Sequence, residues 1–91
     1  MKGKITKRLV DSIKTDPERD ILVWDTDLAG FGLRVSRGGV KSYVFQYKVH
    51  GRARRMTLGE HGRALTLEAA RKLAVTRRLA VQAGGDPATE A

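Results

Sequence analysis

The sequence contains no cysteine, only two prolines and few aromatic residues, which make up 5% of its 91 positions. Without cysteine, a disulfide framework, a thiol nucleophile and a thiolate metal or iron–sulfur centre are all excluded. The two histidines, His50 and His61, cannot by themselves make a metal centre. We therefore expect neither a metal nor a cofactor.

Long hydrophobic runs are also missing. No stretch of about 18 apolar residues occurs, so the sequence predicts no membrane-spanning helix. The N-terminus leads into an amphipathic stretch instead of a signal-peptide core, and we expect a cytoplasmic protein with no membrane partner. The length fits one domain, and 41% hydrophobic with 31% charged residues is a composition that can fold.

Acidic residues are scarce in the middle third of the chain. The net charge is +8, and residues 1–33 contribute nothing to it because their acids and bases balance. Residues 64–91 add +1 and residues 34–63 add +7, with Glu60 as the only acid in that stretch. A basic run is often only a solvated face, but an excess this local favours a phosphate-binding surface. The bases of this stretch are Arg34, Arg37, Lys41, Lys48, Arg52, Arg54, Arg55 and Arg63.

The first part of the chain predicts one short helix and one short strand. Apolar residues recur at helical spacing from Ile5 to Ile13, Thr6 is placed to cap the helix, and Pro17 ends anything helical beyond it. Residues 21–24 form a brief β-rich run. We predict a short helix followed by a short extra strand.

Three further strands are predicted over residues 31–36, 41–49 and 52–58. Residues 37–40 contain two adjacent glycines and form the first turn, and His50 with Gly51 forms a compact hairpin loop. The central strand alternates most clearly, which predicts one apolar and one polar side. Its apolar side holds Tyr43, Phe45, Tyr47 and Val49, and its polar side holds Ser42, Val44, Gln46 and Lys48. On the following strand Met56 and Leu58 match the apolar side, and Ala53, Arg55 and Thr57 match the polar side.

A longer helix follows the loop at residues 59–63. Thr66 is its expected N-cap, Glu68 lies in its first turn, and it runs to about Ala83. Glycines 84 and 85 with Pro87 stop it, and residues 85–91 are interpreted as a linker. The apolar arc contains Leu67, Ala70, Leu73, Ala74, Ala80 and Val81, and the opposite side contains Glu68, Arg71, Lys72, Arg78 and Gln82. Arg77 falls inside the apolar arc, and Val75 and Leu79 fall outside it.

These elements predict an α+β fold. A three-stranded antiparallel β-sheet is packed on one face by the C-terminal helix, with a short N-terminal helix and a short extra strand. The other face of the sheet stays open. It presents a row of hydrogen-bond donors on a rigid platform, and a β-ribbon of this kind can enter the major groove of DNA.

The candidate DNA contacts divide by position. Arg34, Lys48 and Arg55 are expected side by side on the open face, although a solvated sheet surface is the simpler alternative. Gln46 is the best candidate for base reading, because an amide can both donate to and accept from adenine. Ser36, Ser42 and Thr57 are weaker candidates. Arg37, Arg52 and Arg54 lie in or beside turns and are expected to reach phosphates, though Arg54 could instead cover the sheet edge.

Other chemistry has less support. Glu60 and His61 are interpreted as polar loop residues instead of a metal or acid–base site. The glycines near residues 30 and 38 lack the spacing of a nucleotide-binding loop. Trp24 is flanked by apolar residues, so core packing is favoured over base stacking.

The order of several motifs resembles a known family. The motifs are residues 28–35 (LAGFGLRV), 41–48 (KSYVFQYK), 54–59 (RRMTLG), 65–71 (LTLEAAR) and 85–87 (GDP). Together they resemble the N-terminal arm-type DNA-binding domain of phage and genomic-island integrases, which are tyrosine recombinases. The resemblance implies that residues 1–84 bind arm-type sites on double-stranded DNA through a three-stranded sheet, and that core-binding and catalytic domains follow residues 85–91.

The resemblance brings no catalysis to this segment. The recombinase nucleophile is a tyrosine of the C-terminal domain, and Tyr43 and Tyr47 alternate with Phe45 on the predicted core face, where packed rings are typical. We expect no enzyme activity and no small-molecule substrate. An alternative is a protein-interaction module that contacts other integrase protomers or accessory factors, favoured by Val75 and Leu79. An RNA-binding module is less favoured, because the predicted open face lacks aromatic stacking residues.

Overall fold

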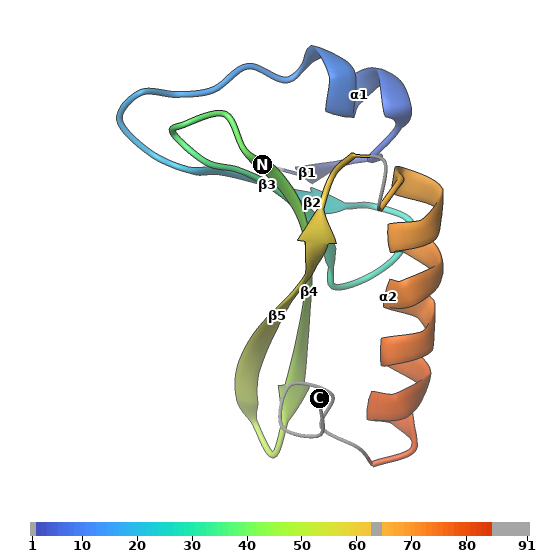
Figure 1. Ribbon diagram of the computed structural model, residues 1–91. Coiled ribbons are helices and arrows are strands. Elements are labelled where there is room, and N and C mark those ends of the chain that lie inside the picture. The colour runs from blue at the N-terminus through green and yellow to red at the C-terminus, as the bar shows by residue number, and fades with distance from the viewer. Residues whose placement is uncertain (1, 63–64, 85–91) are drawn as a thin grey trace.

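The computed structural model describes residues 2–62 and 65–84. The predicted linker over residues 85–91 and the basic residue Arg63 lie outside the described residues. The elements in chain order are β1 (Lys2–Gly3), α1 (Lys7–Ser12), β2 (Ile21–Asp25), β3 (Phe31–Val35), β4 (Lys41–Val49), β5 (Arg52–Glu60) and α2 (Leu67–Gln82) (Figure 1).

The predicted α+β class is confirmed, but the sheet is larger than predicted. Five strands lie in the order β1-β2-β3-β4-β5, with β1 parallel to β2 and every other pair antiparallel. The run over residues 21–24, predicted as a short extra strand beside a three-stranded sheet, belongs to the sheet itself, because β2 pairs with β3 along most of its length. β1 has only two residues, too few to show the alternation by which strands are recognised.

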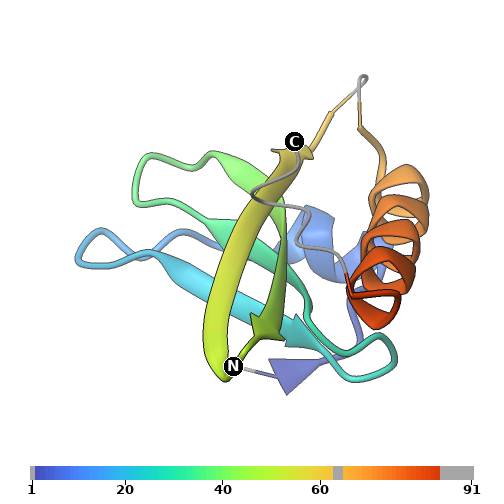
Figure 2. The same cartoon turned by 90° about the horizontal axis from the view of Figure 1, so that it is seen from below.

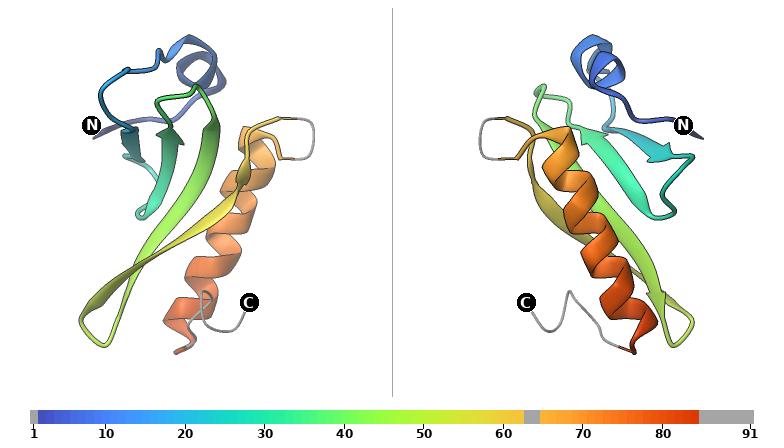
Figure 3. Two further views of the ribbon diagram at one scale, coloured as in Figure 1. Left: turned by 60° about the vertical axis from the view of Figure 1, so that its left-hand side comes forward. Right: turned by 90° about the vertical axis from the view of Figure 1, so that its right-hand side faces the viewer.

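Helix α2 covers one face of the sheet, over β4 and β5 (Figures 2 and 3). Ala70 and Ala74 are fully buried and let the helix backbone approach the strands. The strand residues of this core are Val23, Phe31, Leu33, Val35, Tyr43, Phe45 and Tyr47, and Ile5 and Val10 extend it beside α1. The predicted core position of Tyr43 and Tyr47 is confirmed, with 0% and 5% exposure.

Both predicted helix caps are present. The Thr6 hydroxyl accepts a hydrogen bond from the backbone N–H of Leu9, and the Thr66 hydroxyl accepts one from the N–H of Ala69. Helix α2 ends at Gln82, and Gly84 follows with a φ of 93°. The predicted extent of the long helix is thus correct within a residue.

The β4–β5 hairpin extends beyond its neighbour. The last residue pair between β3 and β4 is Phe31 with Phe45, so residues 47–49 of β4 pair only with residues 52–54 of β5. We call this two-stranded part, residues 47–54, the outer ribbon; it forms the lower end of the hairpin in Figure 1. His50 and Gly51 form its tip with φ values of 50° and 79°, as the predicted hairpin loop requires.

A β-bulge offsets the two strands near the other end of the hairpin. Tyr43 lies opposite Gly59 and Val44 lies opposite Thr57, which leaves Leu58 as the extra residue. Beyond the bulge β5 continues to Glu60 instead of ending at the predicted residue 58. The register is regular up to the bulge, so Thr57 lies opposite Val44 on the side of the sheet away from α2.

Candidate nucleic-acid interface

The face of the sheet away from α2 is the candidate DNA-binding surface. Residues directly opposite in antiparallel strands project on the same side, so the pairing register defines its members. This open face consists of Leu22, Trp24, Gly32, Arg34, Ser42, Val44, Gln46, Lys48, Ala53, Arg55, Thr57 and Glu60.

Six of the ten predicted DNA contacts lie on the open face. Gln46 is directly opposite Arg55, and Lys48 is the next residue of β4 on the same side. Arg34 is opposite Ser42, one strand away. The six are Arg34, Ser42, Gln46, Lys48, Arg55 and Thr57.

The other four predicted contacts lie elsewhere. Ser36 and Arg37 belong to the β3–β4 turn, where the Ser36 hydroxyl accepts a hydrogen bond of 3.0 Å from the N–H of Val40. Arg52 and Arg54 lie opposite Val49 and Tyr47, on the α2 side of the outer ribbon. The predicted set is therefore one surface plus two flanking groups.

The open face is not wholly polar, which corrects two predictions. Val44, placed on the polar side from its alternation, is only 1% exposed. Trp24, expected in the core, does not belong to the main core cluster. It stands on the open face over Gly32, where an added Cβ would be 2.7 Å from the Trp24 Cε3 atom. The pairing of Trp24 with Gly32 places the ring on this face, and that pairing follows from the strand register, which the sequence alone does not reveal.

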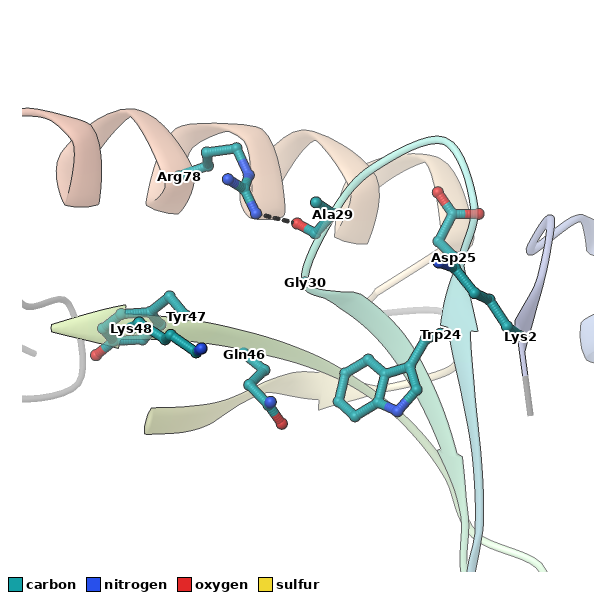
Figure 4. A pocket seen from close by; sticks show the side chains of 9 residues that line it. All are labelled: Lys2, Trp24, Asp25, Ala29, Gly30, Gln46, Tyr47, Lys48 and Arg78. Carbon is teal, nitrogen blue, oxygen red and sulfur yellow. Dashed lines mark hydrogen bonds between the residues drawn. The ribbon is translucent and has the colours of Figure 1, made fainter. Parts of the chain in front are cut away.

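Arg55 is held in place on the open face by two neighbours. Its guanidinium carbon lies 5.4 Å from the centroid of the Trp24 ring, within the range of a cation–π interaction. Its Nη2 donates a hydrogen bond of 3.1 Å to Gln46 Oε1. Figure 4 shows Trp24 and Gln46 on the side of the sheet opposite Arg78 of α2.

Arg34 differs because it already has an acidic partner. Its Nε and Nη2 donate to Asp20 Oδ2 at 3.1 and 2.5 Å, and Asp20 Oδ1 accepts the N–H of Arg37 at 3.2 Å. The hydrogen bond from Arg34, followed by that from the Arg37 backbone, lowers the pKa of Asp20 below its ordinary value. Asp20 therefore stays charged at neutral pH and partly neutralises this end of the basic surface.

A hollow lies where β3 stops short of β4. Gly30 has a φ of 86°, and an added Cβ there would be 2.3 Å from the Gln46 carbonyl oxygen, so only glycine fits. Arg78 donates to the Ala29 carbonyl on the α2 side of this hollow, and Lys48 lines it beside Gln46 (Figure 4). The close approach of Gly30 and the hydrogen bond from Arg78 hold the backbone around Gln46 in place.

Two arginines of α2 point toward the sheet, which corrects their predicted place on the polar side of the helix. Arg78 lies over the Phe45 ring with 5.6 Å to its centroid. Arg71 donates to Asp25 Oδ2 at 2.7 Å and to the Ile5 carbonyl at 2.6 Å. Burial raises the pKa of the Asp25 carboxyl, but the hydrogen bonds from Arg71 and from two backbone N–H groups outweigh it, and the pKa lies below its ordinary value.

The remaining helix positions agree with their predicted sides. Val75 and Leu79, outside the apolar arc, are 44% and 60% exposed. Arg77, inside the arc, has a buried Nε atom. These positions leave two large apolar side chains on the outer face of α2.

His61 has a structural partner that the sequence did not reveal. Its Nδ1 lies 2.7 Å from the Tyr43 hydroxyl, and the two rings meet edge to face. Burial, with a smaller contribution from the Asp11 charge, raises the pKa of Tyr43 to about 12. Both observations fit a packed tyrosine and do not fit an activated nucleophile.

Comparison with known families shows to which family the chain belongs. A family model described as the arm DNA-binding domain matches residues 5–91. The chain belongs to the arm DNA-binding domain family. The resemblance drawn from the five motifs is confirmed, and an arm DNA-binding domain binds DNA and is a non-catalytic unit.

Two further findings complete this comparison. No curated protein matches the chain. Over residues 2–62 and 65–84, no helix of this arm DNA-binding domain is long and apolar enough to span a membrane.

Proposed function

We propose that this arm DNA-binding domain reads short arm-type repeats in double-stranded DNA by placing its open face in the major groove. The observation that carries the proposal is the contiguous group of Gln46, Arg55 and Lys48, which a rigid strand pair presents on one side. Paired strands lie about 5 Å apart and the major groove is about 12 Å wide, so the hairpin fits the groove.

Base reading and phosphate contact are assigned to different residues. Gln46 and Arg55 face outward from the middle of the hairpin and are proposed to contact base edges. Lys48 and Arg34 flank them, and Ser42 and Thr57 add weaker polar contacts. Arg37 and Ser36 in the β3–β4 turn, and Arg52 and Arg54 on the other side of the outer ribbon, are proposed to contact phosphates, which gives affinity without sequence information.

The parent protein is proposed to be a tyrosine recombinase of a prophage or genomic island. In it, residues 1–84 would hold arm sites while residues 85–91 lead toward core-binding and catalytic domains. Its cytoplasmic location and its part in integration and excision belong to the same proposal. The support is the family membership together with the integrase-like motifs.

Selection from a randomised duplex pool tests the proposal. We expect the 91-residue chain to enrich a defined sequence, and fluorescence anisotropy to show preference over a scrambled duplex that persists as salt is raised. Arg55→Ala and Lys48→Ala should weaken binding without unfolding the domain, and loss of a phosphate contact should lower the salt dependence of log affinity by about one unit. Equal, salt-sensitive binding to every duplex would contradict sequence-specific recognition.

Single-stranded RNA belongs in the same titration. The argument that the open face lacks an aromatic ring is wrong, since Trp24 lies there. However, Arg55 covers the Trp24 ring, so the ring is not presented for base stacking. We expect the duplex to bind more tightly than the RNA.

A second candidate function is an interaction surface for integrase protomers or accessory proteins. It is favoured by the exposed Val75 and Leu79, one turn apart on α2. In the full-length protein, Leu79→Glu would then reduce assembly on DNA without changing arm-site affinity of the isolated domain. Unchanged assembly would remove this candidate.

A further inference from the structure

Trp24 lies outside the hydrophobic core cluster. It projects from β2 onto the open face and packs close enough to Gly32 to leave no room for a side chain there. It is half-buried. An aromatic ring beside the proposed base-reading residues needs a reason other than core packing.

The ring holds Arg55. A free arginine side chain loses rotamer entropy when it is ordered, and a cation–π contact with tryptophan offsets part of that cost. The guanidinium lies 5.4 Å from the ring centroid, so the fold offers Arg55 this contact before any DNA is bound. Preorganisation of this kind favours a defined contact over a loose electrostatic one.

Gln46 fixes the orientation of the same guanidinium. Its Oε1 accepts one N–H of Arg55, and the guanidinium has five N–H donors. Two adjacent donors remain for the fork that matches the O6 and N7 acceptors of guanine. Gln46 Oε1 keeps a second lone pair and its amide NH2 stays available to donate, so this pairing is compatible with the adenine contact expected from the sequence.

We propose that Trp24 is a positioning residue that stacks the Arg55 guanidinium, braced by Gln46, for reading a guanine in the major groove. The inference rests on the proposed function, which supplies the duplex. Among the described residues no carboxylate pairs with Arg55, so its charge stays available to DNA. Trp24 touches no base itself and acts through Arg55.

The test uses the duplex that the wild-type chain enriches from the random pool. Each guanine is replaced in turn by 7-deazaguanine, which keeps the base pair and lacks the N7 acceptor. We expect one position at which this change weakens wild-type binding about tenfold, the discrimination of one bidentate contact. Trp24→Leu should lose this sensitivity, and Arg55→Lys, whose ammonium is a point donor without the planar fork, should reduce it, while binding to scrambled duplex changes by less than about twofold.

Conservative variants separate positioning from folding. Trp24→Phe restores a ring face and should recover part of the 7-deazaguanine sensitivity. Arg52→Lys, the same exchange on the opposite side of β5, should keep all of it. Trp24 is the only tryptophan, so its fluorescence in the Arg55→Lys variant reports loss of the stacked guanidinium directly.

The outcomes are distinguishable. If the wild-type chain enriches no sequence, the proposed function fails and this inference fails with it. If a sequence is enriched but no guanine position responds, or if Trp24→Leu weakens selected and scrambled duplexes equally, the proposed function stands and the role of Trp24 is structural. If Trp24→Leu does not fold by circular dichroism, full sensitivity in Arg55→Lys still overturns the inference.

Discussion

On each face of the sheet an arginine lies over an aromatic ring, but the two arginines have different charged partners. On the covered face Arg71 lies 5.1 Å from the centroid of the Phe31 ring, and on the open face Arg55 lies 5.4 Å from that of Trp24. Arg71 also meets the Asp25 carboxylate, whereas Arg55 meets only a neutral amide. The ring contact holds both guanidinium groups in place. The Asp25 carboxylate neutralises the charge of Arg71 inside the fold, whereas the charge of Arg55 has no counter-charge in the part of the chain that the structure describes.

Arg34 stands between these two cases. It lies on the open face like Arg55 but is paired with Asp20 like an internal arginine. Both groups of that pair are partly exposed, so water and salt weaken the pairing. The comparison therefore predicts that DNA affinity depends on how strongly each arginine is already neutralised.

The largest expected effect is on stability, from breaking the covered-face pair. Arg71→Ala leaves the Asp25 carboxylate, whose side chain is 0% exposed, without its counter-charge, and should lower the free energy of unfolding by about 3 kcal/mol. Urea denaturation followed by circular dichroism measures it. Lys72→Ala, which removes an exposed partner of Glu68 on the same helix, should change little. Equal losses in both variants would mean that the buried pair adds nothing.

The next largest effect is expected on DNA affinity, when an arginine–carboxylate pair like that of Arg71 and Asp25 is made on the open face. Gln46→Glu places a carboxylate against Arg55, so the guanidinium becomes internally paired and the surface gains a negative charge. We expect the affinity for the selected duplex to fall at least about tenfold and the salt dependence to drop by about one unit. Anisotropy titration measures both.

The matched control for that exchange is Gln82→Glu. It makes the same change of charge at the end of α2, away from the open face. If it weakens binding as much as Gln46→Glu does, net charge alone explains the loss and the neutral partner of Arg55 is irrelevant.

A smaller effect should appear as a pH dependence of stability. The pKa of Asp25 in the folded protein is below its ordinary value of 3.8, so its pairing stabilises the fold above that value. The advantage of wild type over Asp25→Asn should therefore shrink as the pH falls through about 4 toward the folded-state pKa. Urea denaturation across this pH range checks it, with the exposed Asp27→Asn as control. A gap that widens on acidification would contradict the assignment.

The smallest effect should come from freeing Arg34. Asp20→Asn keeps an acceptor for the Arg37 N–H but removes the counter-charge, and should raise duplex affinity by about two- to fivefold at low salt. Asp16→Asn removes an acid that pairs with Arg19, outside the open face, and serves as the control of equal net charge. An equal gain in both variants would point to long-range attraction alone.

Much of the fold was predictable because its signals are local. Thr6 and Thr66 precede apolar residues at helical spacing, and both are caps. Alternation in residues 41–49 and the His50–Gly51 tip predicted the hairpin and the side on which its residues project. The register of the structure then brings Gln46, Lys48 and Arg55 together.

The features that the sequence did not reveal depend on distant partners. Arg71 looks polar on a helical wheel, and its inward direction follows from Asp25, 46 residues away. Trp24 sits among apolar neighbours, and only its pairing with Gly32 places it on the open face. Periodicity reports which residues share a side of one element, but it does not report what the other elements bring to that side.

The outer ribbon also has a kinetic consequence. The molecule is 37 Å along its longest axis. At its α1 end, residues 7–20 carry four acids and four bases, which balance, whereas the hairpin at the opposite end carries Lys48, Arg52, Arg54 and Arg55 with no acid between residues 46 and 56 (Figure 1). The net positive charge is therefore displaced toward one end, and the field of a DNA duplex exerts a torque on the resulting dipole before the surfaces touch. The domain should thus approach DNA with the outer ribbon in front. A larger fraction of encounters then has the orientation needed for binding, and association is faster than for an evenly charged domain of equal net charge.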